Sequence, residues 1–145
     1  MTWRENLEEL VVARLRASDT AQAFRTILSL HGLADVDALL GRAQASAPFA
    51  AVKYDDAVAV QEPGGQHEAT ARLSVVVGGT NYRGEAERRA TLYGLLDLVQ
   101  GALMGWAPAA GMGEMHWVGE EPTVIVEGGV EVWVQEYTVR LMLTA

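Results

Sequence analysis

The residues whose spacing comes closest to a chemical motif lie in a glycine-rich turn, Gly79-Thr80-Asn81-Tyr82-Arg83-Gly84. Gly-x-x-x-x-Gly between a strand and a helix is the first half of a phosphate-binding loop, which continues with Lys and then Ser or Thr. In this chain Gly84 is followed by Glu85 and Ala86. A carboxylate in the lysine position repels phosphate, so the sequence excludes nucleotide binding at this turn.

The remaining titratable residues lack the spacing of a metal site. The histidines His31, His67 and His116 are scattered and form no His-x-x-x-His pattern. The acidic pairs Asp55-Asp56 and Glu120-Glu121 offer carboxylates for a cation. Adjacent side chains on a strand point to opposite faces, however, and acids beside turns are usually solvated. We therefore predict no metal-binding residues.

Nucleophilic chemistry also has no motif in this chain. The sequence contains no cysteine and no Gly-x-Ser-x-Gly segment, so a thiol nucleophile and a nucleophile elbow are both excluded. We predict no catalytic and no cofactor-binding residues. An enzyme whose catalytic groups meet only in the folded chain stays an alternative.

The hydrophobic pattern around these residues predicts an α+β fold, in which two or three helices pack on one face of a single mostly antiparallel or mixed β-sheet. The strongest pattern is a strand from Ala69 to Gly78, then the polar turn, then a helix from Glu85 to Met104. Segment 23–30 fits a helix or a strand, and His31-Gly32 after it favours the strand. The other expected elements are helices over 2–17 and 35–45, and strands over 49–60, 115–118, 123–126 and 131–143.

Capping residues mark the expected helix ends. Thr2 and Glu5 have the spacing of a capping box at the start of the first helix. Asp35 is expected to cap the second helix, and Gly105 is expected to end the long one.

Length and composition predict one folded domain over residues 1–145. A chain of 145 residues, half of them hydrophobic, buries a sizeable core without crosslinks. No apolar run approaches the roughly 18 residues of a membrane-spanning helix, and the acidic start differs from a signal peptide. The absence of cysteine fits a reducing cytoplasm.

The negative charge is concentrated near the C-terminus. The chain carries a formal net charge of −8, and residues 111–145 contain a single basic residue, Arg140. The acids of this region are Glu114, Glu120, Glu121, Glu127, Glu131 and Glu136. An acidic surface repels phosphate backbones, so sequence-specific nucleic-acid binding is disfavoured.

The tryptophans offer candidate contact residues, because Trp is enriched in protein interfaces and buries a large area. Core packing is the alternative for each of them. They lie near element ends or on late strands, at Trp3, Trp106, Trp117 and Trp133.

The last strand is expected to have two different faces. Trp133 shares one face with Tyr137, which favours the core for both. Val132 and Val134 fall on the opposite face with Glu136, a mixed surface that suits contact with another subunit.

Six segments, taken in their order and spacing, form a pattern over nearly the whole chain. They are Ala-Arg-Leu-Arg-Ala at 13–17, Ala-Pro-Phe-Ala-Ala-Val-Lys-Tyr at 47–54, Leu-Ser-Val-Val-Val at 73–77, Asn-Tyr-Arg-Gly-Glu-Ala at 81–86, Tyr-Gly-Leu-Leu-Asp-Leu-Val-Gln-Gly-Ala-Leu-Met-Gly at 93–105 and Tyr-Thr-Val-Arg-Leu at 137–141. In this pattern the chain resembles the Mu-like phage and prophage tail terminator family of tail completion proteins.

The resemblance implies a ring, commonly a homohexamer, at the head-proximal end of a phage tail tube. Such a ring ends tube polymerisation and forms part of the neck that joins tail to head. Its implied partners are further copies of itself, the tail tube protein and a head-closure or connector protein, with no membrane. It assembles in the host cytoplasm and then belongs to the virion. An acidic lumen would let genome DNA pass through without sticking.

The family has no catalytic residues to carry over, so the candidate site is an interface. Loops that project from a rigid sheet usually carry recognition. We expect contacts with neighbouring subunits or the tube at Asn81, Tyr82, Arg83, Trp117, Glu120, Glu121, Val132 and Val134.

Two other functions are consistent with the sequence. A head-closure or tail-tube protein of the same particle shares the size and the sheet-rich composition. A cytoplasmic ligand-binding or enzymatic α+β domain is the alternative from another class, and the absence of a nucleophile, metal spacing or phosphate loop counts against it.

Overall fold

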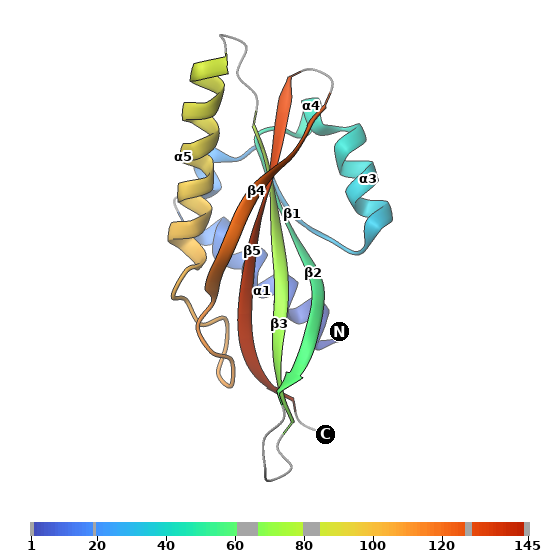
Figure 1. Cartoon of the computed structure of the whole chain (residues 1–145), viewed down its shortest axis with the longest axis vertical. Helices are drawn as coiled ribbons and strands as arrows, with labels where there is room; N and C mark the ends of the chain where they lie inside the picture. The colour runs from blue at the N-terminus through green and yellow to red at the C-terminus, as the bar shows by residue number, and fades with distance from the viewer. Residues whose placement is uncertain (1, 19, 61–66, 80–84, 127–128, 144–145) are drawn as a thin grey trace.

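The computed structural model describes residues 2–18, 20–60, 67–79, 85–126 and 129–143. Its elements run along the chain in the following order (Figure 1): α1 (Trp3–Ala17), α2 (Thr20–Ala23), β1 (Thr26–Leu30), α3 (Leu33–Gly41), α4 (Ala43–Ser46), β2 (Phe49–Val60), β3 (His67–Gly79), α5 (Glu85–Leu103), β4 (His116–Val126) and β5 (Val130–Leu143).

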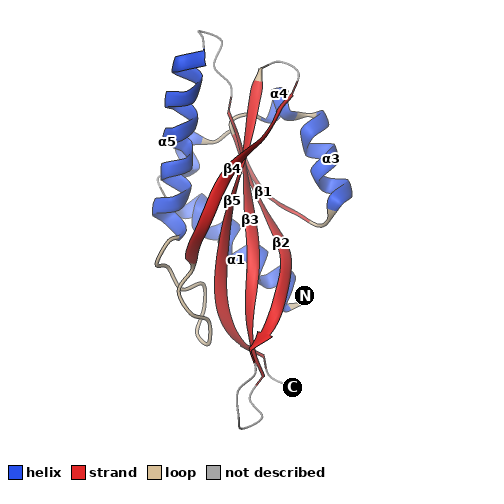
Figure 2. Cartoon of the chain, in the orientation of Figure 1, coloured by secondary structure: helices blue, strands red, loops and turns tan. Residues whose placement is uncertain are grey.

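The strands form a five-stranded mixed sheet in the order β1-β2-β3-β5-β4. The short β1 pairs parallel with β2, and the other neighbours are antiparallel (Figure 2). The α+β prediction is confirmed, and segment 23–30 contains a strand as favoured. The two edges of the sheet are therefore β1 and β4, which are different strands in different surroundings.

The main core lies between the sheet and the helices α1 and α5, with α1 crossing behind the sheet in the view of Figure 1. Helix α1 buries Leu7, Val11 and Leu15 at the i, i+4 and i+8 positions of one face. The sheet supplies alternate side chains, such as Leu73 and Val75 on β3, because successive residues of a strand point to opposite faces. This period of two leaves the intervening residues for the other face.

A second core lies on the opposite face, under α3 and α4. Leu39 of α3 and Ala43 of α4 pack there against Phe49, Val76 and Val132 of the sheet. Helices thus cover both faces of the sheet, although the sequence predicted them on one face. Phe49 and Val76 belong to strands whose sequences are apolar on both faces, which is the pattern of a strand covered from both sides.

The helix ends confirm some of the expected caps. Thr2 stands at the N-cap of α1, and its side chain accepts a hydrogen bond from the Glu5 backbone nitrogen at 3.3 Å. Gly105 follows α5 with a φ of +82°, a left-handed conformation in which glycine has no steric penalty.

The expected helix over 35–45 is two shorter helices, and Asp35 is not its cap. Gly32 occupies the N-cap position of α3, with a φ of +106°. The Asp35 carboxylate accepts a hydrogen bond from the His31 backbone nitrogen at 2.9 Å, so it binds the loop before the helix instead.

The prediction of two strands over 115–118 and 123–126 is wrong. The structure has one strand, β4, which continues through Glu120, Glu121 and Pro122. Its register against β5 shifts twice, between Trp117 and Gly119 and between Pro122 and Val124. Proline is tolerated here because the outer side of an edge strand needs no N–H for the ladder.

Val132 does not lie on an open surface, so the expected mixed surface at this residue is wrong. Its side chain is 1% exposed and belongs to the second core. Val132 does lie on the opposite face of β5 from Trp133, as the sequence predicted. Helices α3 and α4 cover that face of the sheet at Val132. Val134 packs against the same core and is partly exposed.

None of the helices within the described ranges has the length and hydrophobicity that crossing a bilayer requires.

Candidate interaction surfaces at the sheet edges

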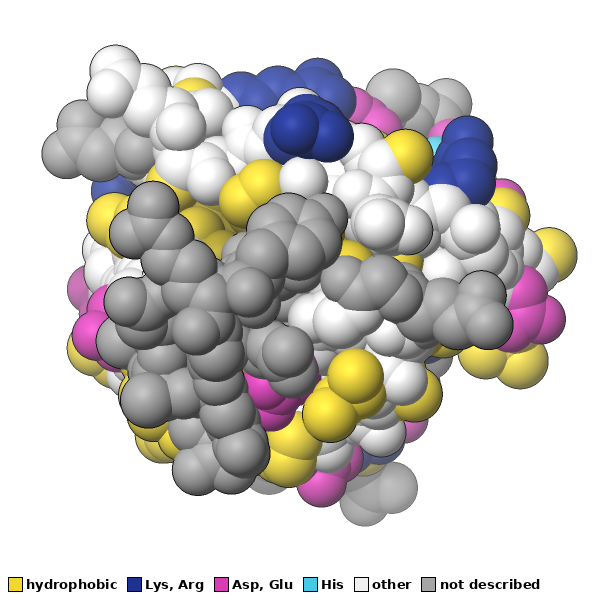
Figure 3. Space-filling view, turned by 90° about the horizontal axis from the view of Figure 1, so that it is seen from above, with side chains coloured by type: hydrophobic (Ala, Val, Ile, Leu, Met, Phe, Trp, Pro, Cys, Tyr) yellow, Lys and Arg dark blue, Asp and Glu magenta, His cyan; other side chains and the backbone are white. Residues whose placement is uncertain are grey.

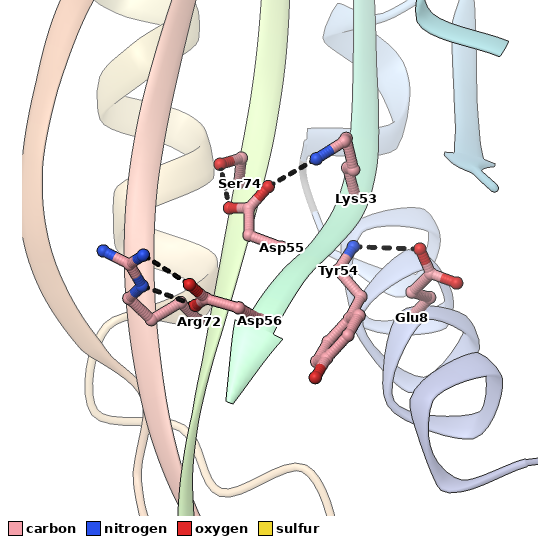
Figure 4. Close-up of polar contacts among 7 residues, drawn as sticks. All are labelled: Glu8, Lys53, Tyr54, Asp55, Asp56, Arg72 and Ser74. Carbon is pink, nitrogen blue, oxygen red and sulfur yellow. Dashed lines mark hydrogen bonds and ion pairs between the residues drawn. The ribbon is translucent and has the colours of Figure 1, made fainter. Parts of the chain in front are cut away.

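The part of the second face that α3 and α4 do not cover carries polar side chains of β2 and β3, which Figure 4 shows together. A register shift between Tyr54 and Asp56 inserts an extra residue into β2. Such a bulge re-aims the following side chain, so Asp55 and Asp56 both reach this face. The expectation that the two carboxylates point to opposite faces is therefore wrong.

Each of these carboxylates is already paired within the subunit. Lys53 Nζ lies 2.7 Å from Asp55 Oδ1, and the Ser74 hydroxyl donates a hydrogen bond to the other oxygen of Asp55. Arg72 donates two hydrogen bonds to Asp56, at 2.6 and 2.5 Å. These hydrogen bonds lower the pKa of Asp56 below its usual value. Cations on the protein itself neutralise the acids, and the described residues contain no group of three or more potential metal ligands.

A second polar cluster joins α1 to the end of β1 and includes a serine, a histidine and a glutamate in contact. The Ser29 hydroxyl lies 3.4 Å from His31 Nε2, and His31 Nδ1 lies 3.2 Å from Glu8 Oε1. Nucleophilic catalysis requires the serine hydroxyl to donate to the histidine. Here the Ser29 hydroxyl donates its proton to the Glu9 carboxylate at the shorter distance of 3.1 Å. The proton therefore points toward Glu9 and away from His31.

The structure gives Glu8 a different task. The parallel strand β1 ends at Leu30, which pairs with Lys53, so the next residue of β2, Tyr54, has no strand on its β1 side. Glu8 Oε2 accepts a hydrogen bond from the Tyr54 backbone nitrogen at 2.9 Å and takes the place of the missing strand (Figure 4). Glu8 is 4% exposed, so it satisfies a backbone donor within the fold.

The edge strand β4 gathers several of the predicted interface residues. Glu121 is exposed and has no ion pair within the described chain, and Trp117 is 37% exposed. Glu120 accepts a hydrogen bond from the Gln135 side chain at 3.0 Å. The acidic hollow is the name we give to a space of about 230 Å³ lined by Val118, Gly119, Glu120, Glu121, Val134 and Glu136.

Behind Glu120 lies a buried network that holds β4, β5 and α5 together. Gln135 is fully buried, and its amide nitrogen donates to the Leu96 carbonyl at 3.0 Å as well as to Glu120. The Tyr137 hydroxyl donates to Gln135 Oε1 at 2.7 Å. Burial and the nearby Glu120 carboxylate raise the pKa of Tyr137 above its usual value of 10.0. Hydrogen bonding to the buried Gln135 therefore holds Glu120 in place beside the acidic hollow.

The opposite edge, at β1, carries arginines. The basic hollow is the name we give to a space of about 390 Å³ lined by Arg16, Ala21, Phe24, Arg25, Thr26 and Ile27. Arg16 donates to the Ile27 carbonyl at 2.6 Å, and Arg25 donates to the Ala45 carbonyl at 3.0 Å. Carbonyl groups orient these guanidinium groups without neutralising their charge.

The structure thus brings some predicted site residues together and separates others. Glu120, Glu121 and Val134 line one hollow, and Trp117 lies on the same strand. Val132 lies inside the subunit. Asn81, Tyr82 and Arg83 lie outside the described residues.

Sequence reasoning missed Gln135, Arg16 and Arg25. Gln135 had a detectable signal, because it is a polar residue between Trp133 and Tyr137 on the strand face predicted to be buried. Arg16 and Arg25 had none, since isolated arginines at the ends of elements are usual on any soluble protein.

The other tryptophans favour the core alternative. Trp3, Trp106 and Trp133 are partly buried and pack against the main core. Trp3 meets Tyr54 edge to face at a centroid distance of 5.5 Å, and Trp133 meets Tyr93 in the same way at 5.9 Å.

Comparison with known proteins adds two findings. The fold is similar to that of a chain in the virion of a native gene transfer agent particle, with a TM-score of 0.62 and 14% identity, over 94% of this chain and 95% of that one. At this identity the likeness concerns the fold alone. A comparison with curated protein sequences found no match.

The family assignment is independent of that likeness. A sequence model of the family described as phage tail terminator protein matches residues 7–145, which span every strand and nearly all helical residues of the fold. The chain belongs to the phage tail terminator protein family.

Proposed function

We propose that this phage tail structural protein forms a ring on the head-proximal end of a tail tube, where it ends polymerisation and provides part of the neck. The observation that carries the proposal is the family match over residues 7–145. Further copies of the chain, the tail tube protein and a head-closure protein are the partners that this function requires. Assembly takes place in the host cytoplasm, before the protein becomes part of the virion.

The two sheet edges support a ring. A cyclic ring needs heterologous contacts, in which one patch of a subunit meets a different patch of the next. Here β1 and β4 are different edges with opposite charge, because Arg16 and Arg25 lie at one and Glu120 and Glu121 at the other. A protein whose edges were alike would favour closed pairs instead.

The test combines the purified chain with polymerising tube protein from the same particle. Electron microscopy should show density on one end of each tube, and tube growth should stop at that end. Density along the tube wall, density on both ends, or continued growth would contradict the proposal.

A control separates the related functions at the same joint. The chain is incubated alone under the conditions in which the tube protein polymerises, and separately with heads and with tubes. Self-assembly into long tubes would identify it as a tube protein, and binding to the portal end of heads without binding to tubes would identify a head-closure protein.

A further inference from the structure

The acidic and basic hollows lie at opposite edges of one sheet, and their chemistry is complementary. Three carboxylates line the acidic hollow, with the aliphatic side chains of Val118 and Val134 beside them. A hollow of this kind suits a guanidinium group, which forms charge-assisted hydrogen bonds with carboxylates while its stem packs on apolar surface.

The charges of these hollows are incompletely compensated within the subunit. Glu121 forms no ion pair with a described residue, and Arg25 bonds the Ala45 carbonyl rather than a carboxylate. The open polar face of β2 and β3 differs, because its acids are paired with Lys53 and Arg72. Glu121 and Arg25 thus keep charges that no described residue of the subunit neutralises.

The ladder of the sheet relates the heights of the two hollows along the strands. Glu121 pairs with Val134, and the ladder continues through Val76 and Ala51 to Leu28 on β1. Arg16 donates to the carbonyl of Ile27, one residue before Leu28, and Arg25 lies three residues before Leu28. In a ring whose axis runs along the strands, neighbouring copies keep the same height, so the acidic edge of one copy faces the basic edge of the next.

In the view along the strands, most of the visible Lys and Arg side chains lie in the upper half of the picture (Figure 3). Opposite charges at the two edges favour head-to-tail contact, because two identical edges of like charge repel each other.

Direct pairing of the two edge strands is disfavoured. Pro122 provides no N–H, and two register shifts interrupt β4. On β1, Arg16 occupies the Ile27 carbonyl at 2.6 Å. Side chains must therefore make the contact, and the exposed Val124 and Ile125 add apolar area beside the acids.

We propose that copies of this chain associate head to tail, with Arg25 at the basic hollow of one copy facing Glu121 at the acidic hollow of the next. The inference rests on the proposed ring and names the surfaces that close it. It assigns Glu121 to a subunit contact rather than to the lumen.

Charge reversal tests the contact. Light scattering and sedimentation across a concentration series give the apparent dissociation constant of the oligomer. Glu121→Arg and Arg25→Glu should each raise it about tenfold or more, and the double variant should recover most of the loss. Glu114→Arg and Arg4→Glu, exposed residues away from both hollows, are the matched controls and should leave it unchanged. Failure of the double variant to recover association would overturn the proposal, provided that thermal melting shows folded protein.

Cross-linking tests the orientation of neighbouring copies. The chain contains no native cysteine, so a thiol-specific reagent reacts only at the introduced positions. Glu121→Cys and Arg25→Cys are treated with a short bismaleimide, in concentrated solution and on tube ends. The double-cysteine chain should give a ladder of products, and a mixture of the two single variants should give dimers containing one copy of each. Products from Glu121→Cys alone would indicate an isologous contact, and absence of the ladder in both settings would also overturn the inference.

The cross-linking and tube-end experiments together distinguish failure of this inference from failure of the proposed function. Head-to-tail oligomers that ignore tube ends would refute the cap and leave the contact standing. Capped tubes without cross-links between positions 25 and 121 would refute the contact and leave the cap standing.

Discussion

At the scale of single residues, the polar groups of this protein serve the fold. Glu8 closes the gap left by a short strand, Gln135 joins three elements, and Arg72 and Asp56 neutralise each other. Each is satisfied by partners within the subunit.

Replacing Glu8 tests its proposed place in the fold. Glu8→Ala should lower the free energy of unfolding by about 1–3 kcal/mol, because the buried Tyr54 N–H loses its acceptor. Glu8→Gln should lower it less, since the amide oxygen still accepts that hydrogen bond. Urea denaturation measures both, with the exposed Glu9→Ala as control. Equal losses for alanine and glutamine would mean that the carboxylate charge matters more than the acceptor.

Tyr137 predicts how stability depends on alkaline pH. Its folded-state pKa lies above the unfolded value of about 10, so the unfolded chain releases the proton first as pH rises. The contribution of neutral Tyr137 is complete below pH 10 and is lost above it. We expect wild-type stability to fall between pH 8 and about 10.5, with a smaller fall in Tyr137→Phe.

Urea denaturation at these two pH values checks the prediction. At pH 8 Tyr137→Phe should cost about 1–3 kcal/mol, because Gln135 Oε1 loses its donor inside the protein. Tyr93→Phe is the control, since Tyr93 is 47% exposed and should leave the pH dependence unchanged. An identical alkaline fall in Tyr137→Phe and wild type would contradict the assignment.

At the scale of elements, the sheet is built around the contact between β2 and β3. Phe49 starts β2 directly opposite Gly78 of β3, and the phenylalanine ring covers the glycine. A Cβ atom on Gly78 would stand 2.3 Å from two ring atoms of Phe49. The ring is fully buried in the second core, so little room exists for it to move.

Gly78→Ala should therefore lower the free energy of unfolding by about 1–3 kcal/mol through overpacking. Gly119→Ala is a matched control in another strand, where an added Cβ meets nothing within 4 Å. Its effect should stay within about 0.5 kcal/mol. Thermal and urea unfolding compare the two, and equal stability for both variants would show that Phe49 adjusts without cost.

At the scale of the whole molecule, charge decides which partners the surface accepts. The net charge of −8 disfavours binding to nucleic acid, because negative surface charge repels the phosphate backbone. Binding to a short labelled DNA duplex, measured by fluorescence anisotropy at about 0.15 M salt, should be weaker than about 10⁻⁴ M. Micromolar binding that weakens steeply with salt would contradict this expectation.

Much of the architecture was predictable from local pattern. The 3.6-residue period of α1 and α5, the alternation along β5 and the Thr2 cap are local features that tertiary contacts preserve. The segment over 115–126 was harder, because Glu120-Glu121-Pro122 has the composition of a turn. Only the position of β4 at the edge of the sheet makes a proline and two register shifts tolerable there.

The amino-acid sequence by itself determined the fold class and the family resemblance, since these depend on residue types and their order. Only the tertiary structure decided that Val132 is buried, that Asp55 and Asp56 share a face, and that arginines line a hollow at one edge of the sheet while glutamates line a hollow at the other. These outcomes depend on which element covers which face, where a bulge shifts a register, and which strands become edges. Contacts between residues distant in the chain set them, and no local pattern records such contacts.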